Sequence, residues 1–93
     1  MDITPQALMF LTTFAEGYLA HMMDEANNEF CGEHDEWYYP HGTDFALNFY
    51  IYGDDILRAT AYKCGKDGQM DTSKSIQLLQ YKIKLKDEDN TYA

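Results

Sequence analysis

Four side chains in this sequence have the chemistry of metal ligands: Cys31, His34, His41 and Cys64. Two thiolates and two imidazoles form a ligand set that a tetrahedral structural zinc site accepts. The first two are spaced Cys31-x-x-His34, whereas Cys64 stands alone at the end of a predicted strand. We therefore keep a zinc-stabilised module as one alternative. The simpler alternative is that both cysteines are small apolar side chains and the protein has no metal or other cofactor.

Carboxylates that could act as general acids or bases occur as neighbours at three places, Asp24-Glu25, Asp35-Glu36 and Asp54-Asp55. Sequence neighbours of this kind are usually solvated charges, whereas acid–base catalysis requires a buried carboxylate with a shifted pKa in a cleft. Cys31 and His34 could supply a nucleophile and its base, but no third orienting residue or oxyanion-hole glycine pattern accompanies them. Because the sequence has no phosphate-binding glycine loop either, we expect a protein that is not an enzyme.

The charge of the chain is strongly negative and unevenly distributed. Sixteen acidic residues and seven Lys and Arg give a formal net charge of −9. All seven basic residues occur from Arg58 onward, so the first 57 residues contain eleven acidic residues and no Lys or Arg. Since nucleic acids and anionic membranes are bound by clustered Lys and Arg, we expect this protein to bind neither of them directly.

The densest negative cluster lies between residues 24 and 39, where carboxylates are interleaved with aromatic side chains. A solvated surface kept for solubility would explain the cluster without any partner. Alternatively, carboxylates on a small rigid scaffold can imitate the phosphates of a nucleic acid, while the aromatic rings add buried contact area. On this second interpretation, the predicted partner-binding residues are Asp24, Glu25, Glu29, Glu33, Asp35, Glu36, Trp37, Tyr38 and Tyr39, with Asp54 and Asp55 from a later turn.

In its size, its negative charge and its lack of catalytic motifs, the chain resembles the small acidic inhibitors that bacteriophages and mobile elements use against host defence. These include anti-CRISPR proteins, anti-restriction proteins and other DNA mimics, and the resemblance is one of composition. It implies a phage-encoded inhibitor whose partner is a basic, nucleic-acid-binding host protein or complex. The alternative is an adaptor or oligomerising domain that binds through an aromatic strand face containing Tyr50, Tyr52 and Tyr62. A separate alternative is a homodimer in which the lysine row, Lys82, Lys84 and Lys86, meets the acidic face of a second copy.

A long amphipathic helix is predicted near the N-terminus. Thr4 and Pro5 have the residue types of an N-cap and a first helical position, and apolar side chains then recur every three or four residues. We place the helix at about residues 5–28, with Gly32 as the glycine that follows its end. Gly17, inside the helix, is expected to mark close packing against the sheet or a partner helix.

The apolar character of this helix raises the question of a membrane span. Polar residues interrupt the run repeatedly, among them Gln6, Thr12 and Glu16, so we expect a buried amphipathic helix instead. Residues 1–23 also contain no Lys or Arg that could form the basic start of a signal peptide. We therefore expect a cytoplasmic protein, located in the host cytoplasm if a phage encodes it.

Short runs of aromatic and apolar residues follow the helix and predict antiparallel strands separated by turns. The clearest alternation spans residues 45–52, and residues 53–55 suit a hairpin connection to the next strand. Residues 76–86 also have helical spacing, but a lysine at every second position, at Lys82, Lys84 and Lys86, favours an edge strand. The predicted strands are 37–39, 45–52, 56–64 and 76–86, with a polar loop through residue 75 and a frayed acidic tail at residues 87–93.

Together these elements predict an α+β fold: one long N-terminal amphipathic helix packed on a three- to four-stranded antiparallel sheet. A chain of 93 residues is typical of a single domain, and we treat residues 1–93 as one. Hydrophobic residues make up 45% of the chain, which is enough to form one modest core. The apolar stripe of the helix is expected to cover one face of the sheet.

Overall fold

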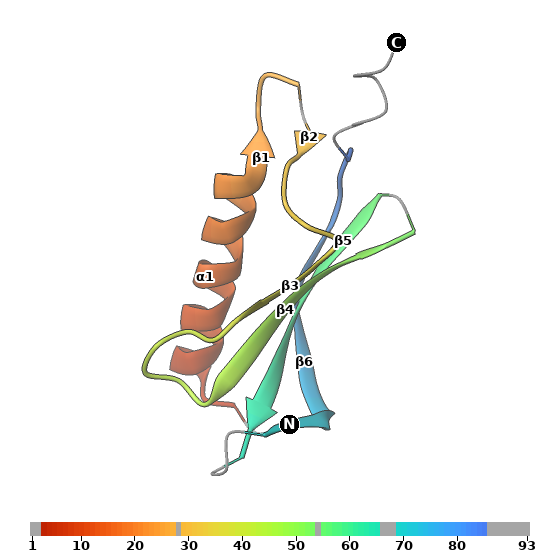
Figure 1. The fold of residues 1–93 in the computed structure, drawn as a ribbon. Helices are drawn as coiled ribbons and strands as arrows, with labels where there is room; N and C mark the ends of the chain where they lie inside the picture. The colour runs from red at the N-terminus through yellow and green to blue at the C-terminus, as the bar shows by residue number, and fades with distance from the viewer. Residues whose placement is uncertain (1–2, 28, 54, 66–68, 86–93) are drawn as a thin grey trace.

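The computed structural model describes residues 3–27, 29–53, 55–65 and 69–85. One helix, α1, lies along one face of a four-stranded antiparallel sheet, and a two-stranded ribbon follows the helix (Figure 1). The predicted α+β architecture is therefore confirmed. Within the described residues, no helix is long and apolar enough to cross a membrane.

Helix α1 spans Pro5–Met22 and begins as the sequence predicted. The Thr4 hydroxyl oxygen accepts a hydrogen bond from the backbone N–H of Ala7 at 3.1 Å, which satisfies one of the free N–H groups of the first turn. Leu11, Ala15 and Tyr18 form the buried stripe that faces the sheet. The helix thus contributes to the core through one side only.

The predicted helix end, near residue 28, is wrong by about six residues. Met23 has an extended backbone, with φ −88° and ψ 131°, and strand β1 (Met23–Asp24) pairs with strand β2 (Glu29–Phe30). The Asp24 carboxylate accepts hydrogen bonds from the backbone N–H groups of Ala26 and Asn27. An Asp side chain that bonds to the backbone two and three residues ahead favours a turn over another helical turn.

Gly17, predicted inside the helix, and Gly32, predicted just after its end, have different surroundings from those expected. Gly32 does not follow the helix end, because the helix ends at Met22. A Cβ at Gly32 would overlap the Phe30 ring and lie 2.8 Å from the Tyr18 hydroxyl oxygen. Gly17 is exposed, and a Cβ there would meet no atom within 4 Å, so the expected close packing against the sheet is wrong. The tight glycine contact is thus at Gly32, beneath Phe30.

The four-stranded sheet has the order β3-β4-β5-β6, and every neighbouring pair is antiparallel. The two central strands, β4 (Phe45–Tyr52) and β5 (Ile56–Cys64), have the predicted bounds. The first strand, β3, is Asp35–Tyr38, where 37–39 was predicted.

Strand β6 is Met70–Lys82, where 76–86 was predicted, so the polar loop expected through residue 75 is wrong. Its polar first half pairs with β5 as an exposed edge, and the register shifts at two places, between Ala59 and Thr60 and between Tyr62 and Cys64. These irregularities break the alternation from which a strand is recognised. Beyond Lys82 the chain pairs with β2 instead, because the Phe30 N–H donates to the Lys84 carbonyl at 2.7 Å. Lys86 and the predicted tail at residues 87–93 lie outside the described residues.

The core lies between α1 and one face of the sheet. Phe45, Leu47, Phe49 and Ile51 of β4 alternate toward this covered face and are buried, together with Leu57, Ala59 and Ala61 of β5. Tyr18 links the two layers, because its ring centroid lies 4.0 Å from that of Phe49. We call the opposite side of the sheet the open face; Figure 1 shows no described element along it.

Candidate functional site

The four candidate metal ligands lie at two opposite ends of strand β4. The backbone N–H of Ile51 donates to the carbonyl of His34 at 3.0 Å, which places His34 and nearby Cys31 at one end. At the other end, the N–H of Cys64 donates to the carbonyl of Asp44 at 2.7 Å, three residues after His41. An extended strand rises about 3.3 Å per residue, so the two pairs are roughly 20 Å apart.

One zinc ion therefore cannot bind all four side chains, since zinc ligands lie about 2.0–2.3 Å from the metal. Across the described ranges, no group of three or more His, Cys, Asp or Glu side chains is positioned to hold a metal ion. Both cysteines are free thiols. The zinc-stabilised module has no support in this geometry.

Four of the predicted carboxylates gather near the C-terminal end of α1, and we call Glu25, Glu29, Glu33 and Glu36 the acidic end. Glu25 lies in the turn of the β1–β2 ribbon and Glu29 in β2, while Glu33 precedes β3 and Glu36 lies within it. Phe30 anchors this part of the chain, because its side chain is 1% exposed. The N–H of Cys31 also donates to the Met22 carbonyl at 2.8 Å.

No glutamate of the acidic end forms an ion pair within the part of the chain that the structure describes. The ion pairs between described residues join Lys63 to Asp44 (3.5 Å), Lys74 to Asp71 (3.9 Å) and Lys82 to Asp55 (3.9 Å). None of them includes a glutamate of the acidic end. Burial, followed by the neighbouring Tyr38 and Glu36, raises the pKa of Tyr18 well above its usual range. The negative potential of this end thus reaches the edge of the core.

The other predicted carboxylates have structural partners. Asp24 stabilises the turn of the ribbon, and Asp55 pairs with Lys82. Asp35 accepts a hydrogen bond at 2.7 Å from the side-chain amide of Asn48, which is only 8% exposed. Asp54 lies outside the described residues. Asp24 and Asp55 are therefore less free to bind a partner, whereas Asp35 has a second carboxylate oxygen that the hydrogen bond from Asn48 does not use.

The three predicted aromatic contact residues point in different directions. Tyr38 turns toward the core and contacts Phe14, Tyr18 and Phe49, so much of its ring is already packed. Trp37 lies on the open face, with its ring centroid 5.5 Å from that of Tyr62. Tyr39, after the end of β3, is 70% exposed. Of these three, Trp37 and Tyr39 remain accessible to a partner.

Lys82 and Lys84 do not form a surface separate from the acidic residues. Lys82 approaches Asp55 in the turn between β4 and β5, and the Lys84 backbone is hydrogen-bonded to Phe30 beside Glu29. Lys82 and Lys84 therefore lie at the same end of the molecule as the acidic end, whereas Lys63 and Lys74 lie together beside Cys64. The acidic and basic residues are therefore less separated in the folded protein than they are along the sequence.

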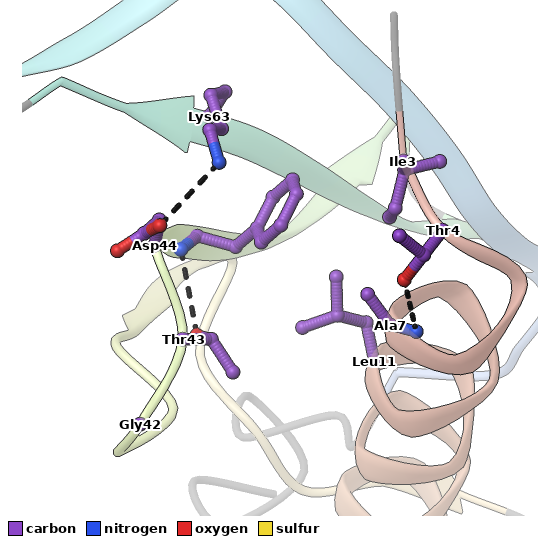
Figure 2. Close-up of a pocket in the computed structure, with 9 residues that line it drawn as sticks. Ile3, Thr4, Ala7, Leu11, Gly42, Thr43, Asp44 and Lys63 are labelled. Atoms are coloured by element: carbon purple, nitrogen blue, oxygen red, sulfur yellow. Dashed lines mark hydrogen bonds and ion pairs between the residues drawn. The ribbon is translucent and has the colours of Figure 1, made fainter.

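A cavity of about 290 Å³ lies at the opposite end, between the start of α1 and the loop before β4 (Figure 2). Its apolar wall is formed by Ile3, Ala7, Leu11 and Phe45. The ammonium group of Lys63 also borders it, but that charge is paired with Asp44 at 3.5 Å. No cluster of titratable side chains that could perform acid–base chemistry faces this cavity from the described residues that line it.

Sequence reasoning missed two residues that organise the open face. Asn48 was assigned only to the strand alternation, yet its buried amide also donates to the Glu36 carbonyl at 3.2 Å and so holds β3 in place. Arg58 was noted as the first basic residue, but its partners were not anticipated: its guanidinium lies 4.4 Å from the centre of the Tyr52 ring. The sequence did contain a signal for these contacts, because an Asn and an Arg occupy positions of two neighbouring strands that alternate away from the core.

The described residues thus present two candidate binding surfaces, the acidic end and the open face of the sheet. The first is defined by carboxylates that form no ion pair among the described residues, and the second by aromatic rings around Arg58. A comparison of the chain with protein families, curated proteins and solved structures finds none that it matches.

Proposed function

We propose that this protein is a small acidic inhibitor that binds a nucleic-acid-binding protein and occupies the cationic groove where the nucleic acid would bind. One observation supports the proposal above the others. The glutamates of the acidic end come from successive segments of the chain, and none of them is ion-paired within the described residues. A partner that supplies Lys and Arg would provide the missing counter-charges.

The local structure favours this use of the carboxylates because it limits the conformational entropy lost on binding. The β1–β2 ribbon is held by the Asp24 turn, and Phe30 fixes the chain to the core. Carboxylates on a pre-formed scaffold lose less freedom on binding than those on a disordered tail. Binding would also release the counter-ions of both surfaces, as happens when a protein binds DNA.

The target class follows from the same chemistry. A groove that binds phosphates presents clustered Lys and Arg, so the partner is a basic, nucleic-acid-binding protein or complex. We place the protein among inhibitors that a phage or mobile element directs against a host defence system, of the anti-CRISPR or anti-restriction type, acting in the host cytoplasm. In this role it binds without performing catalysis.

The test compares two variants that lose the same number of charges. The first replaces Glu25, Glu29, Glu33 and Glu36 with Gln; the matched control replaces Glu16 with Gln and Asp44, Asp55 and Asp71 with Asn. Each immobilised protein is exposed to bacterial lysate, and retained proteins are identified by mass spectrometry before and after elution with double-stranded DNA. We expect the wild type and the control to retain a DNA-binding protein that DNA elutes, and the first variant to lose it.

Two results would contradict the proposal. A partner that DNA does not displace would show that binding does not involve a nucleic-acid groove. Equal loss of binding in both variants would show that net charge matters and the acidic end does not. Circular dichroism of both variants serves as the control for folding.

A further inference from the structure

The open face of the sheet carries aromatic side chains that no described element covers. Tyr50 and Tyr52 are 40% and 43% exposed, and their ring centroids lie 4.7 Å apart. Trp37 and Tyr62 form a second aromatic pair on the same face. A sheet face that meets only water is usually polar, whereas a contiguous exposed aromatic surface is typical of an interaction site.

Two opposite charges flank Tyr50 in one row across this face. Asp35 pairs with Tyr50 between β3 and β4, and Tyr50 pairs with Arg58 between β4 and β5. Neighbouring strands are about 4.8 Å apart, so Asp35 and Arg58 are separated by roughly 10 Å within one molecule. The Arg58 side chain is directed to Gln80 and the Tyr52 ring, and neither Asp35 nor Arg58 belongs to an ion pair among the described residues.

Both charged side chains are held in position. The Arg58 Nε–H donates to the side-chain oxygen of Gln80 at 3.1 Å, while its guanidinium lies against the Tyr52 ring. Asp35 is fixed by the hydrogen bond from Asn48. An arginine has five N–H donors and a carboxylate has two oxygens, so each group retains capacity for another partner.

We infer that the open face is the interface of a homodimer in which two sheets pack face to face and Arg58 of each copy binds Asp35 of the other. A twofold axis that runs along β4, in the plane between the sheets, exchanges the positions of β3 and β5. The Asp35 of each copy therefore lies opposite the Arg58 of the other copy, so this contact occurs twice in the dimer. The two Tyr50 side chains lie opposite each other at the axis. Sheets packed in this way are about 10 Å apart, which aromatic side chains from both copies can fill.

Charge complementarity selects a second copy over other occupants. The row of Asp35, Tyr50 and Arg58 is complementary in charge to a copy of itself rotated by 180°, as a twofold interface requires. A nucleic acid would bring only phosphates to Asp35, whereas a second copy brings an arginine to it. The inference does not depend on the proposed inhibitor function, because the side chain of Glu36 alternates away from the open face and the other glutamates of the acidic end lie outside the four-stranded sheet.

A charge-exchange experiment tests the pairing directly. Sedimentation equilibrium of the full chain should show a concentration-dependent dimer. Arg58→Asp alone and Asp35→Arg alone should each raise its dissociation constant at least about tenfold, because each places like charges opposite one another. An equimolar mixture of the two variants should dimerise again, since every Arg then meets an Asp. This rescue is expected only if the two residues face each other across the interface.

A second pair of variants tests the face without altering Asp35. Tyr50→Lys places two ammonium groups at the twofold axis and should abolish the dimer. Tyr81→Lys is the matched control, because Tyr81 is similarly exposed, at 44%, but pairs with buried Leu57 on the other side of the sheet. A wild type that remains monomeric at all concentrations would overturn the inference. A dimer that survives Tyr50→Lys, or a mixture that fails to reassociate while both variants are folded by circular dichroism, would also overturn it.

Discussion

The two faces of strand β4 differ in environment although they are similar in composition. Phe49 is fully buried between the sheet and α1, whereas Tyr50, the next residue, is 40% exposed on the open face. Both are aromatic, and both belong to the run FALNFYIY, in which neither face is strongly polar. The environment of each ring is set by the position of the helix and not by the local sequence.

This comparison separates stability from binding. Side chains on the covered face contact both layers, so removing one leaves a cavity in the core. The exposed rings of the open face, Tyr50 and Tyr52, lie against their neighbours in the sheet, and their removal costs the monomer little. If the open face binds a second copy, substitutions there should affect association far more than they affect the folding of one chain.

The largest expected effect is on the covered face. Phe49→Ala should lower the free energy of unfolding by about 3–5 kcal/mol, as is usual for a large buried aromatic residue. Tyr50→Ala should lower it by less than about 1 kcal/mol. Urea denaturation, at concentrations low enough to keep the protein monomeric, measures both values. Equal losses in the two variants would mean that the open face is packed within one chain.

Gly32 and Gly17 extend the comparison between packed and exposed positions to the side of the molecule that carries α1. Gly32→Ala should destabilise the fold by about 1–3 kcal/mol, because the new methyl group would overlap the buried Phe30 ring. Gly17→Ala should stabilise it by about 1 kcal/mol, since alanine favours the helix and the space around Gly17 is open. The midpoints of thermal unfolding compare the two. A destabilised Gly17→Ala variant would indicate that another element contacts the outer side of the helix.

The smallest effect is expected at Tyr18, whose hydroxyl is buried without a hydrogen-bond partner in the described part of the chain. Removing an unsatisfied polar atom is neutral or favourable, so Tyr18→Phe should change stability by about 0–1 kcal/mol in the stabilising direction near neutral pH.

The same residue gives the fold a pH dependence. Because burial raises the pKa of Tyr18 above its ordinary 10.0, its contribution to stability is complete below pH 10 and is lost as the pH rises above it, when only the unfolded chain ionises. The wild type should therefore lose more stability than Tyr18→Phe between about pH 8 and about pH 11. Urea denaturation at both pH values measures this difference. Identical losses would show that Tyr18 ionises in the folded protein as readily as in the unfolded one.

Prediction from sequence succeeded where local signals were strong. Thr4 and Pro5 marked the helix start, and strict alternation gave the bounds of β4 and β5. It failed where competing interactions decided the outcome. The Asp24 turn ended the helix early, and the polar first half of β6 forms a strand because β5 offers it a free edge.

The candidate site was predicted in part. The acidic composition of residues 24–39 was evident from the sequence, but not which carboxylates have partners within the fold. Asp35 is bound by Asn48, thirteen residues away along the chain, and Asp55 by Lys82. Sequence distance conceals such contacts, because strand register brings together residues that a linear pattern cannot connect.

The sequence alone determined the secondary-structure classes of the main elements, the excess of negative charge and the aromatic content of the strands, since these depend on residue type and on spacing along the chain. The tertiary structure decided which face of the sheet α1 covers, which glutamates form no ion pair among the described residues, and that Asp35 and Arg58 flank Tyr50. These depend on contacts between residues far apart in the sequence, because packing two layers together assigns each side chain to the core or to the surface.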